Sequence, residues 1–260
     1  MNSWRSLLAL LPVAICLGLG SAHIVAASRA LEIMREVDHG QRTTSRSNIG
    51  AVEVIDRKGK ILRKRWSFTA EGYRGDSKVL VRFSDPPEVR GVGLLTLNHQ
   101  DRPAEQWLYT PAIKRDRRIA SQEKSGRFMG TDFSNEDMEE RSVENYDYDQ
   151  LADDVFDRHP TYKVKGVYRD RENTQYSYLI FWVRKDIMVT TFTEFYVGHD
   201  LRKTLAVGDF QLLQGIWTPQ SMEMKDLVAG STTRVRLSDI AYNATFEPDW
   251  FTLRNLRKDW

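Results

Sequence analysis

The stretch LRKRWSFT, residues 62–69, alternates apolar and polar side chains. Successive side chains of a strand point to opposite faces, so Leu62, Trp66 and Phe68 share one face and the intervening arginine and hydroxyl residues share the other. The same alternation recurs in three later segments, 79–83, 162–168 and 235–237. The pattern is typical of antiparallel sheets that have one face exposed to water.

Turn-forming residues separate these strands and set the number of strands that we predict. They lie at 56–60, 85–87, 170–173, 198–200 and 230. With this spacing the chain holds roughly eleven or twelve strands, most of them joined as hairpins. No helical run alternates with the strands, which excludes a doubly wound α/β fold. We therefore predict a mainly β chain whose antiparallel sheet curls into a sandwich or a barrel.

One amphipathic helix precedes the strands. Leu31, Met34 and Val37 recur at intervals of three residues. Ser28 is a suitable N-cap, and Gly40 is a suitable terminator. The pattern predicts a single helix that begins at Ser28 and ends before Gly40.

The composition limits the class of protein. Of the 260 residues, 41% are hydrophobic and 28% are charged, which excludes a disordered tail and a polytopic membrane protein. The formal net charge of +2 gives no overall attraction to nucleic acid, so we expect no nucleic-acid partner. The single cysteine excludes an internal disulfide framework and a multi-cysteine metal site. Hydrophobic burial must therefore stabilise the fold.

The N-terminus has the pattern of a secretory signal peptide. Arg5 precedes an apolar run over residues 7–20 that ends in small residues. Cleavage after Ala22 or after Ala27 fits the small-residue rule, and we favour Ala27. The expected organisation is a signal peptide over residues 1–27, cleaved on export, and a single domain over residues 28–260.

Two alternatives concern the same segment. A retained membrane anchor is disfavoured because the uncharged run over residues 6–22 is short and contains a proline. Lipidation at Cys16 is disfavoured because Ile15, and not a small residue, precedes it.

Motifs that carry catalysis or metal binding are missing from the sequence. The five histidines have no metal-binding spacing, and there is no nucleophile elbow, phosphate-binding loop or dinucleotide-binding loop. We therefore expect no catalytic residue, no metal site and no cofactor, and we expect that the protein is not an enzyme. Asp153 with Asp154, and Asp147 with Asp149, could bind calcium or form an acid/base pair, but we interpret them as part of a solvated acidic loop. A hydrolase using Asp154 and His159 is the least supported function.

The segment from 121 to 160 interrupts the strand pattern. It contains two glycines and an apolar trio, namely Gly126, Phe128, Met129, Gly130 and Phe133. A short helix is expected after Ser134, which is a suitable N-cap. An insertion of about forty residues in a hairpin-connected β protein is usually a lid or a binding loop.

Basic and aromatic residues leave alternatives open. Lys114, Arg115, Arg117 and Arg118 form a basic cluster, which is either the solvated face of a strand or a site that attracts anionic headgroups or an acidic partner. The chain also has seven tryptophans, ten tyrosines and eleven phenylalanines. These side chains either fill a core or leave a cavity for an acyl chain, and composition alone does not decide between the two.

Two stretches resemble a known family. They are QWLYTPAIKRDRRIA at residues 106–120 and GRFMGTDFSNEDM at residues 126–138. Together they resemble the signature of the outer-membrane lipoprotein-sorting family, which is similar in fold to the periplasmic carrier LolA. The resemblance continues through residues 178–183, 204–209 and 215–224, so it spans nearly the whole chain after the predicted signal peptide.

The resemblance implies an open, unclosed antiparallel β-barrel of about eleven strands, with a helical lid over a hydrophobic cavity. It implies a periplasmic, non-enzymatic carrier for the acyl chains of a lipid or lipoprotein. It also implies transient membrane contact and an RND-type inner-membrane transporter as a partner. The alternative within the same superfamily is a periplasmic lipid sensor or adaptor that regulates a membrane partner.

These implications assign roles to the residues found above. We expect the cavity to be lined by residues that share strand faces, namely Trp66, Phe68, Val81, Phe83, Trp107 and Tyr109. We expect Phe128, Met129 and Phe133 to lie on a movable lid that has Gly126 and Gly130 as hinges. The basic cluster Lys114, Arg115, Arg117 and Arg118 would then contact an anionic headgroup or a transporter.

Overall fold

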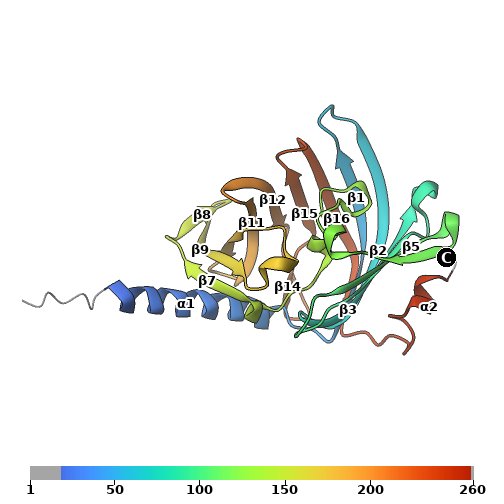
Figure 1. Cartoon of the computed structure of the whole chain (residues 1–260). Helices are drawn as coiled ribbons and strands as arrows, with labels where there is room; N and C mark the ends of the chain where they lie inside the picture. Colours follow the sequence, from blue (N-terminus) through green and yellow to red (C-terminus); the bar gives the residue numbers. More distant parts are fainter. Residues whose placement is uncertain (1–18, 259–260) are drawn as a thin grey trace, which may run out of the picture.

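The alternating segments pair into one antiparallel sheet of fourteen strands (Figure 1). The structure is a computed structural model, and it describes residues 19–258. In spatial order the strands are β6 (Arg115–Arg118), β5 (Glu105–Thr110), β4 (Gly93–Leu97), β3 (Asp76–Asp85), β2 (Ile61–Tyr73), β1 (Ser45–Ile55), β16 (Ser231–Tyr242), β15 (Ser221–Asp226), β12 (Asp200–Gly208), β11 (Val189–Val197), β10 (Tyr178–Arg184), β9 (His159–Tyr168) and β7 (Tyr146–Gln150), and β8 (Asp154–Phe156) pairs with β9. Within the described chain β6 does not pair with β7, so the sheet curls without closing.

The remaining elements are short, apart from one helix. The α-helices are α1 (Leu19–Gly40) and α2 (Leu253–Leu256), and β13 (Gln211–Leu213) and β14 (Ile216–Thr218) form a separate hairpin. The 3-10 helices are η1 (Pro87–Val89), η2 (Pro111–Ile113), η3 (Ser121–Glu123), η4 (Phe128–Gly130), η5 (Glu136–Met138), η6 (Val143–Asn145) and η7 (Arg171–Asn173).

The predicted fold class, a mainly β chain with an open antiparallel sheet, is confirmed. The strand count differs, because the described chain has sixteen strands and not eleven or twelve. The additional strands include β6, β8, β13 and β14, which have only three or four residues each. The three-residue strands are too short to show alternation, and the four residues of β6, RDRR, include no apolar side chain.

The sheet has two faces, and both are partly covered. We call the face that carries Trp66, Val81 and Phe83 the inner face, because these side chains belong to the largest buried cluster. On the outer face a second cluster contains Leu80 and Leu95, which pack under the C-terminal segment 246–256. β3 is consequently buried from Val79 to Phe83 on both faces.

Helix α1 covers the inner face at one end of the strand order. Its side chains Ile33, Met34 and Val37 pack against β7 and β9. The predicted end at Gly40 is confirmed, but the helix begins at Leu19, before the expected N-cap Ser28.

The predicted cleavage site after Ala27 lies inside α1, and the division into a signal peptide and a single domain stays a prediction. The segment 1–18, which contains Cys16, lies outside the described residues.

A second cover lies over the inner face near β2 to β5. We call residues 121–145 the lid segment. It was expected to be helical, and it contains four single-turn 3-10 helices, η3 to η6. The helix expected after Ser134 is η5, whose first residue is Glu136. The lid segment therefore contains no α-helix, and the long helix that covers the inner face is α1.

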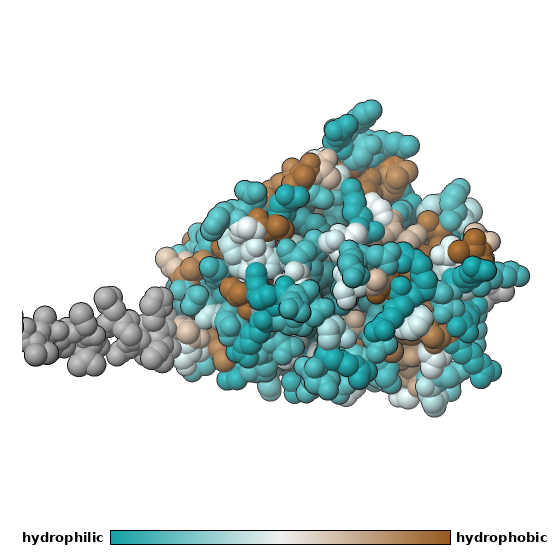
Figure 2. Space-filling model, in the orientation of Figure 1, coloured by the Kyte–Doolittle hydropathy of each residue, from teal (hydrophilic) through white to brown (hydrophobic). Residues whose placement is uncertain are grey.

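The surface in view is mostly hydrophilic, and hydrophobic side chains gather near the strand ends at the top of the view (Figure 2). No helix within residues 19–258 is both long and apolar enough to cross a membrane.

Gly50 provides a test of how tightly the inner face is packed. Gly50 of β1 lies opposite Trp66, and a Cβ at this position would overlap the indole. Phe83 and Phe128 pack on the same indole and keep it in place. We expect Gly50→Ala to lower the free energy of unfolding by about 1–3 kcal/mol, as overpacking does.

Urea denaturation measures this effect, with Gly208→Ala as the matched control. The nearest atom to a Cβ at Gly208 is Ser221 Oγ at 3.6 Å, so this variant should stay within about 1 kcal/mol of the wild type. Equal stability of the two variants would contradict tight packing around Trp66.

Candidate functional site

Three aromatic rings fill the inner face beneath the lid segment. The Phe128 ring lies 6.5 Å from the Trp66 ring and 5.7 Å from the Phe83 ring, measured between centroids. The Trp66 and Phe83 rings meet edge to face at 5.8 Å. All three side chains are buried, and Val81 and Phe133 belong to the same cluster. This part of the barrel is therefore a packed core that the lid segment completes.

Buried Asp132 fastens the lid segment to β16. Its carboxylate accepts hydrogen bonds from Thr233 Oγ1 at 2.6 Å, from Ser231 Oγ and from the Arg127 guanidinium at 2.6 Å. The Asp132 backbone N–H donates to Thr233 Oγ1 at 2.8 Å. A fully buried carboxylate with this many donors fixes the position of the segment on the sheet.

Lys64 of β2 makes a second attachment. Its Nζ donates a hydrogen bond to the Met129 carbonyl, and burial, followed by repulsion from Arg127, lowers the pKa of Lys64. Met129 and Gly130 both have positive φ angles, 48° and 72°, so the chain turns sharply there. The hinge roles of Gly126 and Gly130 stay a prediction.

The acidic part of the lid segment is buried and paired, whereas Asp147, Asp149, Asp153 and Asp154, which were interpreted as a solvated loop, are exposed. Glu139 pairs with Lys124 at 2.7 Å, Glu136 with Arg141 at 2.9 Å and Asp137 with Lys203 at 3.1 Å. The side chains of these three pairs are at most 13% exposed. Lys124 and Arg141 belong to the lid segment itself, so their two pairs hold the segment together, whereas Lys203 of β12 attaches it to the sheet.

Tyr176 adds a hydrogen bond to the same network. Its hydroxyl donates to Asp137 Oδ1 at 2.7 Å. Burial, together with the charge of Asp137, raises the pKa of Tyr176 well above its usual value. The tyrosine therefore stays protonated and remains a hydrogen-bond donor to the carboxylate.

Trp107 and Tyr109 do not lie with the other predicted cavity residues, and this part of the prediction was wrong. Both belong to the outer-face cluster, under the C-terminal segment. On β5 the inner-face cluster receives Leu108 instead. The error is one of parity, because β5 has apolar side chains on both faces and alternation alone does not say which face turns inward.

An apolar cavity of about 520 Å³ lies between α1 and the lid segment. Met34 and Val37 of α1 form one wall, and Phe133 and Met138 of the lid segment form another. Strands supply the remaining apolar wall through Leu179, Phe195, Leu205, Val207, Met222 and Met224. Strand pairing places Leu205 opposite Met224 and Val207 opposite Met222, so these four side chains form a continuous patch.

Of the predicted site residues, Phe68 and Phe133 line this cavity. The strand residues on β10, β11 and β12 were missed. The alternation of Met222 with Met224 and of Leu205 with Val207 was the available signal, because each pair lies on one strand face.

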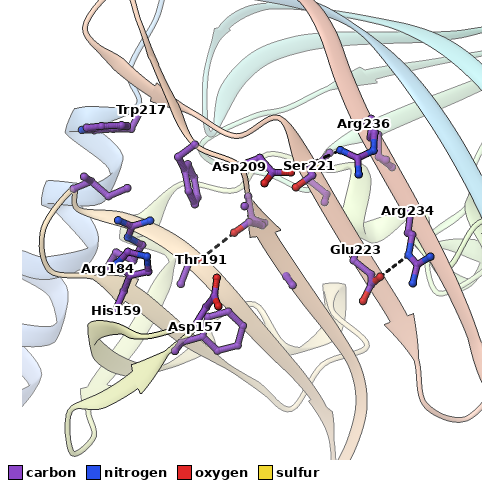
Figure 3. Close-up of a pocket in the computed structure, with 18 residues that line it drawn as sticks. Asp157, His159, Arg184, Thr191, Asp209, Trp217, Ser221, Glu223, Arg234 and Arg236 are labelled. Atoms are coloured by element: carbon purple, nitrogen blue, oxygen red, sulfur yellow. Dashed lines mark hydrogen bonds and ion pairs between the residues drawn. The ribbon is translucent and has the colours of Figure 1, made fainter.

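A second, more polar cavity has a volume of about 800 Å³ (Figure 3), and it adjoins the first. The two cavities share Val207, Phe210 and Met222 as lining residues. The arginines of the polar cavity are paired, Arg234 with Glu223 at 2.6 Å and Arg236 with Asp209 at 3.8 Å (Figure 3). Apolar and polar hollows thus share a wall, an arrangement that suits an amphiphile.

The basic cluster is only partly available for a partner. Arg117 pairs with Glu123 at 2.8 Å, and Arg118 lies 3.8 Å from Glu105. Lys114 and Arg115 are exposed and take part in no ion pair within residues 19–258. The predicted headgroup role of the cluster is not tested by this arrangement.

Within residues 19–258, no group of three or more His, Cys, Asp or Glu side chains is placed to hold a metal ion.

Comparison with known proteins gives a family and a fold. A family model described as an uncharacterized protein matches residues 75–258, which is most of the chain. No curated protein matches the sequence.

Three solved structures share the fold. A putative outer membrane lipoprotein-sorting protein domain from Vibrio parahaemolyticus is 26% identical, with a TM-score of 0.84 over 89% of this chain and 100% of that one. A DUF1329 family protein from Desulfovibrio piger is 24% identical, with a TM-score of 0.85 over 89% and 99% of the two chains. A LolA superfamily protein from Nitrosomonas europaea is 20% identical, with a TM-score of 0.71 over 87% and 98%.

Asp132 provides a test of how the lid segment is held. Asp132→Ala would leave the Thr233 and Ser231 hydroxyls and the Arg127 guanidinium without their acceptor. We expect the free energy of unfolding, measured by urea denaturation, to fall by about 3–5 kcal/mol.

The control is Asp200→Ala, because Asp200 is exposed and has no ion pair in the described chain. It should change stability by about 0.5 kcal/mol or less. An Asp132→Ala protein as stable as this control would show that the carboxylate does not hold the lid segment.

Proposed function

We propose that this chain, which belongs to the matched family and shares the fold of an outer membrane lipoprotein-sorting protein domain and of a LolA superfamily protein, binds the acyl chains of a lipid or lipoprotein and carries them between membranes. The observation that carries the proposal is the apolar cavity between α1 and the lid segment. A volume of about 520 Å³ lies within the range of roughly 300–1,000 Å³ found for small-molecule pockets.

The cavity walls supply the interaction that such a carrier needs. Each methylene that leaves water for an apolar site contributes about 0.8 kcal/mol, so a chain leaves a bilayer only for a site that is nearly as apolar. Leu205, Met222 and Phe195 provide such walls. Lys203 faces inward beside Leu205 on β12, and its charge is paired with Asp137 at 3.1 Å. The acidic groups of the opposite wall are neutralised by their ion pairs.

The adjoining polar cavity supports an amphiphile as the cargo. A ligand whose chain lies against Val207 and Met222 has its polar end within reach of the arginines and carboxylates of the second cavity. We therefore favour a lipid or an acylated protein over a plain hydrocarbon.

The compartment, the lack of catalysis and the transporter belong to the same proposal. We place the carrier in the periplasm, with its signal peptide removed, and we assign it a non-enzymatic role that needs no cofactor. The sequence resemblance supports an RND-type inner-membrane transporter as the partner that supplies or receives the cargo. Co-purification with such a transporter from detergent extracts tests this partner.

Lipid analysis tests the function directly. Protein purified from the periplasm without detergent should carry an acyl lipid in about equimolar amount, detected by mass spectrometry of its extract. The protein should then transfer this lipid between two vesicle populations. Binding without transfer would favour a sensor over a carrier, and protein free of lipid that also fails to bind added lipid would contradict both.

Leu205→Trp tests whether the cavity holds the chain. The larger ring would occupy the space opposite Met224. If it displaces three methylenes, each worth about 0.8 kcal/mol, the affinity for a dansyl-labelled fatty acid should fall by roughly 50-fold.

The matched control is Leu212→Trp, because Leu212 is exposed on β13 and lies outside the cavity. Fluorescence titration of both variants checks the prediction, and circular dichroism checks that both fold. Equal affinities would place the chain elsewhere.

A further inference from the structure

Four large hydrophobic side chains are exposed at two neighbouring hairpin ends. Ile61 and Leu62 lie at the start of β2, and Leu227 and Val228 lie in the turn between β15 and β16. They are between 43% and 63% exposed. The two ends lie side by side because β1 and β16 pair there, Ile55 with Thr232. We call these four side chains the tip patch.

The tip patch lies beside a turn with net positive charge. Arg57, Lys58 and Lys60 in the β1–β2 turn are exposed and form no ion pair in the described part of the chain. The Asp56 carboxylate accepts from the backbone N–H groups of Lys58 and Lys60 at 2.8 and 2.9 Å and offsets one of the three positive charges, so the turn keeps a net charge of +2. Hydrophilic and hydrophobic surfaces meet at the top of Figure 2, where these hairpins end.

Other features of the same end of the sheet have the same character. Antiparallel pairing from β2 through β5 places the β5–β6 turn at this end, and the turn carries exposed Ile113 with Lys114 and Arg115. Exposed Val155 and Leu212, in contrast, lie at the other end of the strands.

We propose that the tip patch docks the protein onto an anionic lipid bilayer. Apolar side chains that enter the interface, combined with nearby Lys and Arg side chains that attract anionic headgroups, are the elements of reversible membrane binding. Unpaired cations beside the patch match an anionic surface. A protein surface would instead require a complementary acidic and apolar groove, and absence of bilayer binding is the outcome that would point to it.

The position of the tip patch links membrane docking to the lid segment, and this link rests on the proposed carrier function. Leu62 and Lys64 are on the same face of β2, and Lys64 holds the Met129 carbonyl of the lid segment. Docking therefore brings one attachment of the lid segment next to the headgroups. Anionic headgroups that attract the Lys64 ammonium compete with that attachment and release the lid segment where cargo enters or leaves.

Vesicle sedimentation tests the docking. The full chain without its signal peptide should bind vesicles of equal parts phosphatidylglycerol and phosphatidylcholine and should not bind phosphatidylcholine alone. Binding should weaken as salt rises. A variant with Arg57→Gln, Lys58→Gln and Lys60→Gln should bind about 100-fold more weakly, since each basic side chain near an anionic surface contributes roughly fivefold.

A second variant and two controls make the result decisive. Leu62→Ser with Leu227→Ser and Val228→Ser should also lose binding, whereas Val155→Ser with Leu212→Ser, at the other end of the strands, should bind like the wild type. Leu205→Trp should bind vesicles normally even if it loses the fatty acid, so failure of the carrier function and failure of docking are distinguishable. Wild-type protein that ignores anionic vesicles, or tip variants that bind them like the wild type, would overturn the proposal.

Discussion

The packing of Phe128 between Trp66 and Phe83 determines which part of the curled sheet is solid and which is hollow. A sheet of fourteen strands that does not close has more inner face than one short segment can cover. The lid segment fills the region over β2 to β5, and α1 fills the region over β7 and β9. The strands between these two covers keep an apolar face with no protein on it, and the 520 Å³ cavity results.

The fold was predictable because alternation reports the sheet, whereas the site was only partly predictable because alternation does not report which face is inward. Trp107 was assigned to the cavity and lies on the outer face, and Leu108 takes the inner position. β3 is buried on both faces, so no pattern on it separates inside from outside. Assigning each residue to the inner or the outer face requires the strand order and the position of the covering segments. Leu80 and Leu95, for example, face outward and are buried because the C-terminal segment covers them.

The attachments made by the acidic residues of the lid segment were not predictable from the sequence for a related reason. An acidic stretch looks solvated when its partners are far away in the sequence, and Lys203 and Thr233 follow Asp137 and Asp132 by more than sixty residues. In the folded protein these carboxylates are buried attachments whose loss exposes uncompensated groups. The segment is held on the sheet by these polar bonds and by the burial of Phe128 and Phe133.

The position of a bound acyl chain tests this account most directly. A fatty acid with a diazirine at its chain end, bound and photolysed, labels the residues that the chain contacts, and peptide mass spectrometry then locates them. The account predicts labels on peptides that contain Leu179, Leu205 and Met222, together with α1 peptides that contain Met34. Labels confined to the β5 peptide with Trp107 and Tyr109, or scattered over the surface without saturation, would contradict it.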